Sequence, residues 1–152
     1  MKNAELFRHI PLFRGLDDKD LLKLAAVATE KTFMPGDVIF SEGTQGDSMF
    51  IVNFGTVRIL KQGKEKEEEI VRMSSGQHFG EMALLDNETR SATADAIEHT
   101  ELIRVGREEL EKLLAQDAAL SSRVYKAFMK YLCNRLRQTT SDLTFMREVA
   151  QR

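Results

Sequence analysis

Apolar residues recur every three or four positions at both ends of the chain, and this period predicts helices there. Residues 3–9 are predicted to form a short helix that ends before Pro11, because a proline inside a helix removes a hydrogen bond and clashes with the preceding turn. Asp17 is a good N-cap, and the apolar face after it predicts a second helix to about residue 28. Residues 1–29 are therefore predicted to be N-terminal helices.

From residue 30 onward the pattern changes to short apolar or alternating runs, which predict strands. Turns that contain glycine separate these runs roughly every eight to twelve residues, and residues 62–64 have the composition of a hairpin tip. The predicted strands are 31–34, 38–40, 49–54, 56–60, 69–73, 90–96 and 101–105. Many short strands with such turns predict an antiparallel sandwich or barrel over residues 30–106.

The end of the chain, residues 107–152, returns to a helical period. A short helix is predicted over 107–115, followed by a long one that Asp117 caps and that runs from 118 to near the C-terminus. The apolar stripe of the long helix steps by four or three residues: Leu120, Val124, Phe128, Leu132, Leu136, Thr139, Leu143, Met146 and Ala150. Such a stripe exceeds what a small sandwich covers. The helix is therefore predicted to pack on the sandwich first and on a second subunit later, as a homodimer.

The composition is that of an ordinary globular domain and gives no global argument for nucleic-acid binding. The 152 residues are 42% hydrophobic and 30% charged, with a net charge of -2 and a pI of about 6.0. No apolar run approaches the ~18 residues that indicate a membrane span. The single cysteine, Cys133, excludes an internal disulfide framework and fits a cytoplasmic location. It is expected to be a packing residue, since a redox sensor needs an exposed, reactive thiol.

Patterns typical of enzymes and metal sites do not occur in the sequence. His9, His78 and His99 lie far apart, unlike the clustered histidines of metal-binding jelly-roll enzymes. The sequence has no His-x-His pair, no serine nucleophile motif and no Walker phosphate loop. We therefore expect no enzymatic activity and no metal cofactor.

Chemistry suited to a phosphate concentrates in residues 79–92. Gly80 lets a ligand approach the backbone closely because it has no Cβ, and residues 81–85 are helix formers that can make one short turn. The free N–H groups at the start of such a turn attract an anion. Arg90 is a permanent cation whose fork of donors matches a phosphate, and Glu81 is an acceptor for sugar hydroxyls. Together with a nearby apolar wall, these groups describe a nucleotide site.

Two separated motifs, residues 38–57 and 79–96, carry a family resemblance over essentially the whole chain. The positions that match in the first motif are Gly43, Gly46, Asp47 and Gly55. The positions that match in the second motif, a phosphate-binding cassette, are Gly80, Glu81, Ala83, Arg90, Ser91 and Ala92. With both motifs in this order, the chain resembles the cyclic nucleotide-binding domain family, which includes bacterial catabolite activators and regulatory subunits of protein kinase A.

The resemblance implies an eight-stranded antiparallel jelly-roll β-sandwich, with N-terminal helices and a long C-terminal helix, that holds cyclic AMP or cyclic GMP. It implies that Arg90 pairs with the cyclic phosphate, while the backbone N–H groups of Ala83 and Ser91 add donors. Glu81 would accept the ribose 2′-hydroxyl, and Gly80 would lie against the sugar. The other cassette residues in the expected binding set are Phe79, Met82 and Ala92. The base is expected to rest on three apolar side chains of the facing strands: Ile59, Val71 and Met73.

The identity of the base is read from fewer residues. Ser91 favours cyclic AMP, because a threonine after the arginine often accompanies cyclic GMP binding in the family. Thr139 and Thr140 match a Thr-Ser pair with which the activators reach the adenine across a dimer. The match requires about four extra residues, one helical turn. Two alternatives stay open: both threonines are plain surface residues, or an apolar or basic residue earlier in the helix makes the lid contact.

The sequence therefore predicts one cyclic nucleotide-binding domain over residues 1–152, which acts as a regulatory switch on an unknown effector when its C-terminal helices move. The chain stops at Arg152, about where the helix-turn-helix of the activators would begin, so no DNA binding is expected. A stand-alone domain and a fragment of an activator-like transcription regulator both fit. A dimerising scaffold that binds no nucleotide is the rival function, and the intact Glu81 and Arg90 argue against it.

Overall fold

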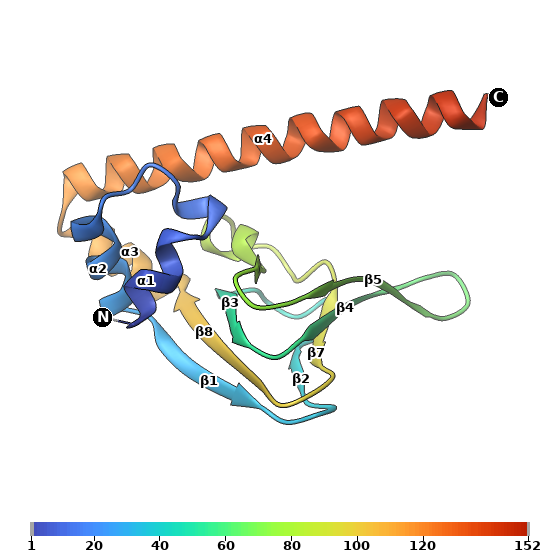
Figure 1. Ribbon diagram of the computed structural model, residues 1–152, viewed down its shortest axis with the longest axis horizontal. Coiled ribbons are helices and arrows are strands. Elements are labelled where there is room, and N and C mark those ends of the chain that lie inside the picture. The colour runs from blue at the N-terminus through green and yellow to red at the C-terminus, as the bar shows by residue number, and fades with distance from the viewer. Residues whose placement is uncertain (1, 152) are drawn as a thin grey trace.

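Eight antiparallel strands form two four-stranded sheets, which pack as a jelly-roll sandwich with helices at one end (Figure 1). The computed structural model describes residues 2–151. One sheet has the order β1-β8-β3-β6 and contains β1 (Thr29–Phe33), β8 (Thr100–Gly106), β3 (Ser48–Phe54) and β6 (His78–Phe79). The other has the order β2-β7-β4-β5 and contains β2 (Val38–Phe40), β7 (Thr93–Ala96), β4 (Val57–Gln62) and β5 (Glu67–Met73). The predicted fold class is confirmed.

Strands β6 and β7 differ from the sequence prediction, and both border the cavity described below. Strand β6 was not predicted, because its two residues are too few to show a period. It pairs with β3 through Phe50 and Phe79. Strand β7 begins at Thr93 rather than at residue 90, so the first part of the predicted strand is loop.

Strand β3 is buried on both faces, which explains its continuous apolar sequence. Phe50 and Val52 join the cluster between the sheets, and Met49 and Ile51 join the cluster beneath the helices. Successive side chains of a strand point to opposite faces, so this one strand connects two cores.

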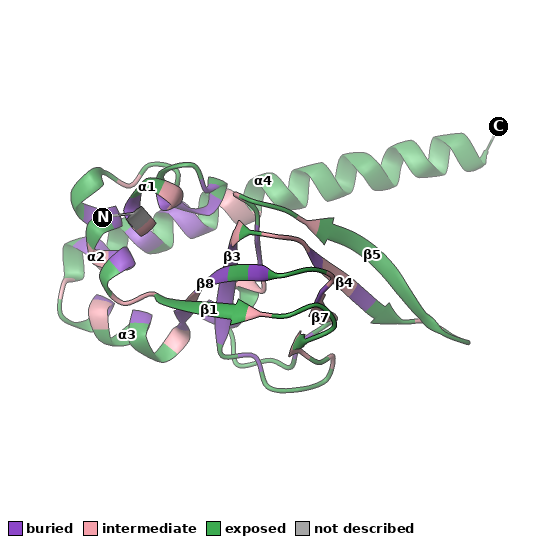
Figure 2. Cartoon of the chain, turned by 60° about the horizontal axis from the view of Figure 1, so that its bottom comes forward, coloured by how far each residue is buried: buried purple, intermediate pink, exposed green. Residues whose placement is uncertain are grey.

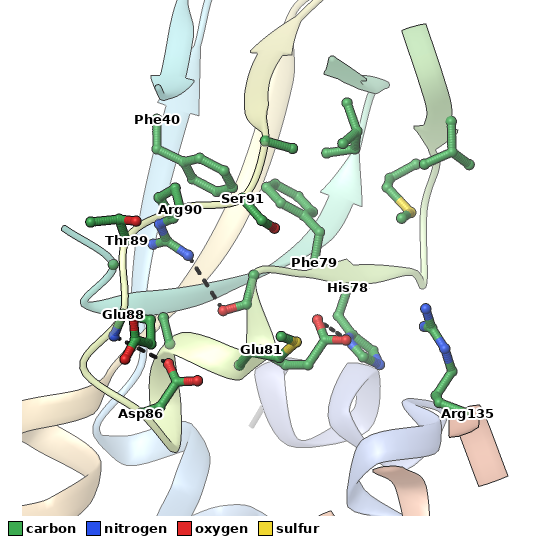
Figure 3. A pocket seen from close by; sticks show the side chains of 18 residues that line it. Phe40, His78, Phe79, Glu81, Asp86, Glu88, Thr89, Arg90, Ser91 and Arg135 are labelled. Carbon is green, nitrogen blue, oxygen red and sulfur yellow. Dashed lines mark hydrogen bonds and ion pairs between the residues drawn. The ribbon is translucent and has the colours of Figure 1, made fainter. Parts of the chain in front are cut away.

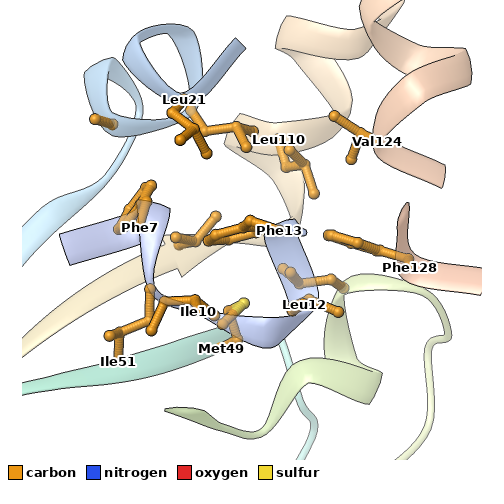
Figure 4. Close-up of a cluster of buried hydrophobic side chains, with 14 of the residues drawn as sticks. Phe7, Ile10, Leu12, Phe13, Leu21, Met49, Ile51, Leu110, Val124 and Phe128 are labelled. Carbon is orange, nitrogen blue, oxygen red and sulfur yellow. The ribbon is translucent and has the colours of Figure 1, made fainter. Parts of the chain in front are cut away.

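Five helical segments cover the outer face of β3 and β8. They are α1 (Lys2–Arg8), the 3-10 segment η1 (Pro11–Phe13), α2 (Asp18–Ala26), α3 (Arg107–Ala115) and α4 (Ala118–Ala150). Phe13 of η1 lies between Phe7 and Phe128, with ring centroids 5.1 and 6.2 Å away (Figure 4). The predicted N-caps are confirmed, because Asp17 and Asp117 accept hydrogen bonds from backbone N–H groups of the first turns.

The start of α4 is tied to α2 by two ion pairs. Nζ of Lys23 donates to Oδ2 of the N-cap Asp117 at 2.9 Å. Both carboxylate oxygens of Asp20 accept hydrogen bonds of 2.8 Å from the Arg123 guanidinium. Asp20 is 1% exposed, and a buried carboxylate needs such a partner. The N-terminal helices therefore hold the first turns of α4 in place.

The two halves of α4 have different environments. Leu120, Val124 and Phe128 are buried against η1 and the neighbouring helices, so α4 reaches the sandwich mainly through them. From residue 133 to residue 151 every position is exposed, and this half projects beyond the sandwich (Figures 1 and 2). The expectation for Cys133 was wrong, because its position on the projecting half leaves it exposed. Within residues 2–151, no helix is both long and apolar enough to cross a membrane.

Candidate functional site

A cavity of about 290 Å³ lies between the second sheet, the segment after β6 and α4 (Figure 3). All the cassette residues singled out in the sequence line it: Phe79, Gly80, Glu81, Met82, Ala83, Arg90, Ser91 and Ala92. The three side chains expected beneath the base line it as well: Ile59, Val71 and Met73. Segments far apart in the sequence thus meet around one space, of a size that suits a small ligand.

The cassette begins with a backbone turn that requires glycine. Gly80 has a φ of 77°, in the left-handed region, and precedes the 3-10 segment η2 (Glu81–Leu84). A Cβ at this position would lie 2.7 Å from Nη1 of Arg90. The predicted short turn after Gly80 is therefore present, and the N–H of Ala83 already donates to the Gly80 carbonyl over 3.2 Å.

Arg90 lies beneath the floor of the cavity with a side chain that is 6% exposed. Its guanidinium donates to the carbonyls of Ser48 at 2.7 Å and of Gly80 at 3.4 Å, and lies 4.0 Å over the ring of Phe40. Asp47 approaches it to 3.9 Å. In the described part of the chain, its Nε is the only fully buried side-chain nitrogen or oxygen without a hydrogen-bond partner.

Burial lowers the pKa of Arg90, since a charged guanidinium is less stable away from water. The nearby Asp47 carboxylate raises it, and the cations Arg104 and Arg107 lower it further. An arginine nevertheless keeps its charge in proteins at neutral pH. The cavity wall therefore contains a fixed cation, and its buried Nε is a donor that no protein acceptor satisfies.

Glu81 supplies the opposite charge from the start of η2. Its Oε2 lies 3.3 Å from Nδ1 of His78, and its Oε1 accepts a long hydrogen bond of 3.4 Å from the Tyr131 hydroxyl. Burial by itself would raise the pKa of Glu81. The hydrogen bond and charge of His78, with smaller contributions from the Glu81 backbone N–H and from Arg135, outweigh burial and lower that pKa. Glu81 is therefore an ionised acceptor at neutral pH.

One arginine outside the cassette holds its backbone in place. Nη1 of Arg107, at the start of α3, donates to the carbonyls of Gly46 and Ala83 at 3.0 Å and of Asp86 at 2.8 Å. The sequence did not reveal this role, because Arg107 reads only as the first residue of a helix. The two predicted motifs, around residues 46 and 83, are thus joined by a side chain that belongs to neither.

The long helix reaches the cavity through Arg135, and not through the threonines. Arg135 lines the cavity, and its guanidinium donates to the Tyr131 hydroxyl at 2.9 Å. Thr139 and Thr140 are exposed further along α4, where the Thr140 hydroxyl donates to the Leu136 carbonyl at 2.9 Å. Within one chain the structure therefore agrees with the alternative in which a basic residue earlier in the helix makes the lid contact. A contact of the threonines with a second subunit stays a prediction.

Several residues at the cavity were not predicted. Phe40, His78, Asp86, Glu88 and Arg135 line it beside the expected set. His78 directly precedes the cassette, Asp86 and Glu88 lie inside it, and Phe40 lies in the first motif. Across residues 2–151, no three His, Cys, Asp or Glu side chains gather as a metal site would require. The cavity therefore provides a cation that can bind a phosphate, a carboxylate that can accept from hydroxyls and an apolar wall that can support a flat ring.

A family model for the cyclic nucleotide-binding domain matches residues 30–117. Among curated relatives, a cGMP-dependent protein kinase of Drosophila melanogaster, isozyme 2 forms cD5/T2, is 30% identical over 116 residues. The aligned part is 74% of this chain and 12% of the kinase, so the chain spans a small part of that relative.

Solved structures share most of this architecture. The catabolite activator protein of Thermus thermophilus has a TM-score of 0.77 at 30% identity, with 90% of this chain and 63% of that chain covered. The regulatory domain of Toxoplasma gondii PKA, solved with cAMP, has a TM-score of 0.69 at 28% identity. That alignment covers 74% of this chain and 43% of the other.

Proposed function

Because the chain belongs to the cyclic nucleotide-binding domain family, we propose that its cavity binds cyclic AMP in preference to cyclic GMP and that binding moves α4. One observation carries the assignment of the site. Arg90, with its unsatisfied Nε, and the ionised Glu81 line the same cavity beside an apolar wall. This combination supports a cyclic nucleotide over the rival scaffold without a ligand, because a cation and a carboxylate at one cavity match a phosphate and a sugar hydroxyl.

Each part of the nucleotide has a proposed partner. The cyclic phosphate pairs with Arg90 and with backbone N–H groups of Ala83 and Ser91, and the Ala83 N–H exchanges the Gly80 carbonyl for the phosphate. The ribose 2′-hydroxyl donates to Glu81, while Gly80 lies against the sugar. Three apolar side chains support the base: Ile59, Val71 and Met73. Hydrogen bonds to charged groups contribute about 1.5–3 kcal/mol each, so a few of them supply micromolar affinity.

The preference for cyclic AMP rests on Ser91. The relatives include a kinase named for cGMP and a PKA domain solved with cAMP, so the family alone leaves the base open. Arg135 is proposed as the lid residue of the same chain, and Thr139 with Thr140 as contacts to the cavity of a second subunit.

Movement of α4 is proposed to start after Phe128. Up to this residue one face of the helix is buried, and Arg123 ties it to α2, so this half is anchored. Beyond it, Tyr131 bonds the carboxylate that the ribose would use. A ribose hydroxyl that donates to Glu81 competes with the Tyr131 hydroxyl for this carboxylate. Because Tyr131 belongs to α4, this competition biases the position of α4.

Calorimetry with cyclic AMP and cyclic GMP tests the site. We expect wild type to bind cyclic AMP more tightly than cyclic GMP. The Arg90→Ala variant should lose about ten- to a hundredfold in affinity, the equivalent of one hydrogen bond to a charged group. Arg72→Ala is the matched control, because Arg72 is exposed on β5, bonds to Glu69 and does not line the cavity. Failure of wild type to bind either nucleotide, or equal affinity in Arg90→Ala, would show that the site is assigned wrongly.

A further inference from the structure

His78 is a buried imidazole at the edge of the cavity. It belongs to β6, where it pairs with Ile51 of β3, and its side chain is 5% exposed. Figure 3 shows its ring beside Glu81, on the side of the cavity away from Arg90. A histidine that is buried beside a ligand site and bonded to one of the functional groups of that site fixes the orientation of that group.

Two elements hold the ring of His78 in one orientation. Its Nδ1 lies 3.3 Å from Oε2 of Glu81, at the start of η2. On another side the ring packs on Tyr131 of α4, with centroids 5.1 Å apart. The imidazole thus occupies the junction of the cassette and the long helix, and it fixes one oxygen of the carboxylate.

The charged and titratable groups that face His78 come from η2 and α4. Glu81 brings a carboxylate to the ring, and Arg135, which bonds the Tyr131 hydroxyl, brings a cation. Tyr131 is neutral at physiological pH. The neighbouring strand β3 contributes no ionisable side chain, since its sequence is Ser48-Met49-Phe50-Ile51-Val52-Asn53-Phe54. Among the groups that these elements bring to the ring, the Glu81 carboxylate is therefore the one that bonds it.

Resting on the proposed function, we propose that His78 is a positioning residue for the nucleotide: it orients Glu81 toward the ribose, and its protonation strengthens binding. A protonated imidazole is a stronger donor to a carboxylate than a neutral one, so it holds Glu81 more firmly. A cyclic nucleotide also brings a phosphate anion into the cavity, and this negative charge favours the imidazolium further. Binding is therefore accompanied by proton uptake.

The sign of the pH dependence follows from this linkage. Since the bound state favours the proton, affinity is highest below the titration of the imidazole and falls as the pH rises through it. Glu81 stays ionised over this range, because its pKa lies below the ordinary value. We expect roughly three- to tenfold weaker cyclic AMP binding at pH 8 than at pH 6, the size that one interaction with a charged imidazole supplies.

Calorimetry with cyclic AMP at pH 6, 7 and 8, in two buffers of different ionisation enthalpy, measures affinity and proton uptake together. His78→Gln keeps a donor but cannot titrate, so it should bind with a flat pH profile and no uptake. His78→Phe removes the donor and should bind more weakly at every pH. His99→Gln is the control, because His99 is 47% exposed and pairs with Glu101 outside the cavity. It should keep the wild-type profile.

The outcomes separate this inference from the proposed function. A wild type that binds cyclic AMP with a flat profile, or a His78→Gln variant that keeps the wild-type slope, overturns the role of His78 and leaves the nucleotide site standing. A wild type that binds no cyclic nucleotide at any pH overturns both. Should the variants fail to fold, NMR titration of the wild-type His78 ring decides. Its midpoint should rise when cyclic AMP is added, and an unchanged or lowered midpoint refutes the proposal.

Discussion

At the scale of single residues, the site depends on a glycine as much as on its charged groups. Gly80 turns the backbone at a φ of 77° and leaves room for the Arg90 guanidinium. Two constraints therefore act on one position: a conformation that side chains disfavour, and a neighbour that a Cβ would displace. Gly76 shares only the first constraint, because it has a φ of 86° and a Cβ there would meet nothing within 4 Å.

This difference gives a matched pair of variants. Gly80→Ala and Gly76→Ala should each cost about 1–2 kcal/mol of stability, since both force an L-residue into the left-handed region. Only Gly80→Ala should also lower the affinity for cyclic AMP, by at least about tenfold, because Arg90 must leave its place over Phe40. Chemical denaturation and calorimetry on both variants provide the two measurements. Equal loss of affinity in the two variants would mean that strain alone, and not contact with Arg90, explains the glycine.

At the scale of elements, the chain shows which features a sequence can predict. Helices with clear caps, such as those that begin after Asp17 and Asp117, lie where the pattern placed them, because capping and periodicity are local. Strand β6 escaped prediction because pairing with β3, and not its own sequence, makes it a strand. The cassette was found because its residues are close together in the sequence.

Contacts between residues that are far apart in the sequence could not be predicted from local patterns. Arg107 binds the Gly46 carbonyl across 61 positions, and Tyr131 binds Glu81 across 50, so neither contact leaves a local pattern. The face of α4 that meets the cavity depends on how the Phe128 end is packed. That packing brings Arg135 to the cavity and leaves Thr139, one helical turn further along α4, exposed.

Cyclic AMP is predicted to restrain the exposed half of α4. Addition of cyclic AMP should slow amide exchange over residues 133–150, where every side chain is exposed, because the ligand fixes Tyr131 and Arg135. Residues 118–128 should change little, since Phe128 and Arg123 already anchor them. Mass spectrometry of exchanged peptides compares the two segments within one sample. In Tyr131→Phe, which loses the bond to Glu81, the added protection should shrink while the nucleotide still binds. Equal protection changes in both segments, or none, would refute the proposed movement.

At the scale of the whole molecule, the projecting half of α4 leaves an apolar stripe without a partner in its own chain. Leu136, Leu143 and Met146 are exposed there, and they continue the stripe whose first members are buried. From Leu132 onward the spacing alternates between four and three residues, as it does in helices that wind around each other. The partner that fits is a second copy of the same helix, because a two-fold axis places identical stripes face to face.

We therefore predict that the protein is a dimer through α4, with twice the 17.3 kDa mass of one chain. The double variant Leu136→Glu, Leu143→Glu should be monomeric, because it places like charges in the seam. Gln138→Glu with Ser141→Glu adds the same charge on the opposite face of the helix and should stay dimeric. Sedimentation velocity measures the masses, and calorimetry on the monomeric variant asks whether one chain suffices for binding. A monomeric wild type at tens of micromolar would refute the predicted dimer through α4. A monomeric variant with unchanged affinity would show that Thr139 and Thr140 of a second subunit do not contribute to nucleotide binding. Arg135 of the same chain would then be the only one of these three α4 residues that contributes.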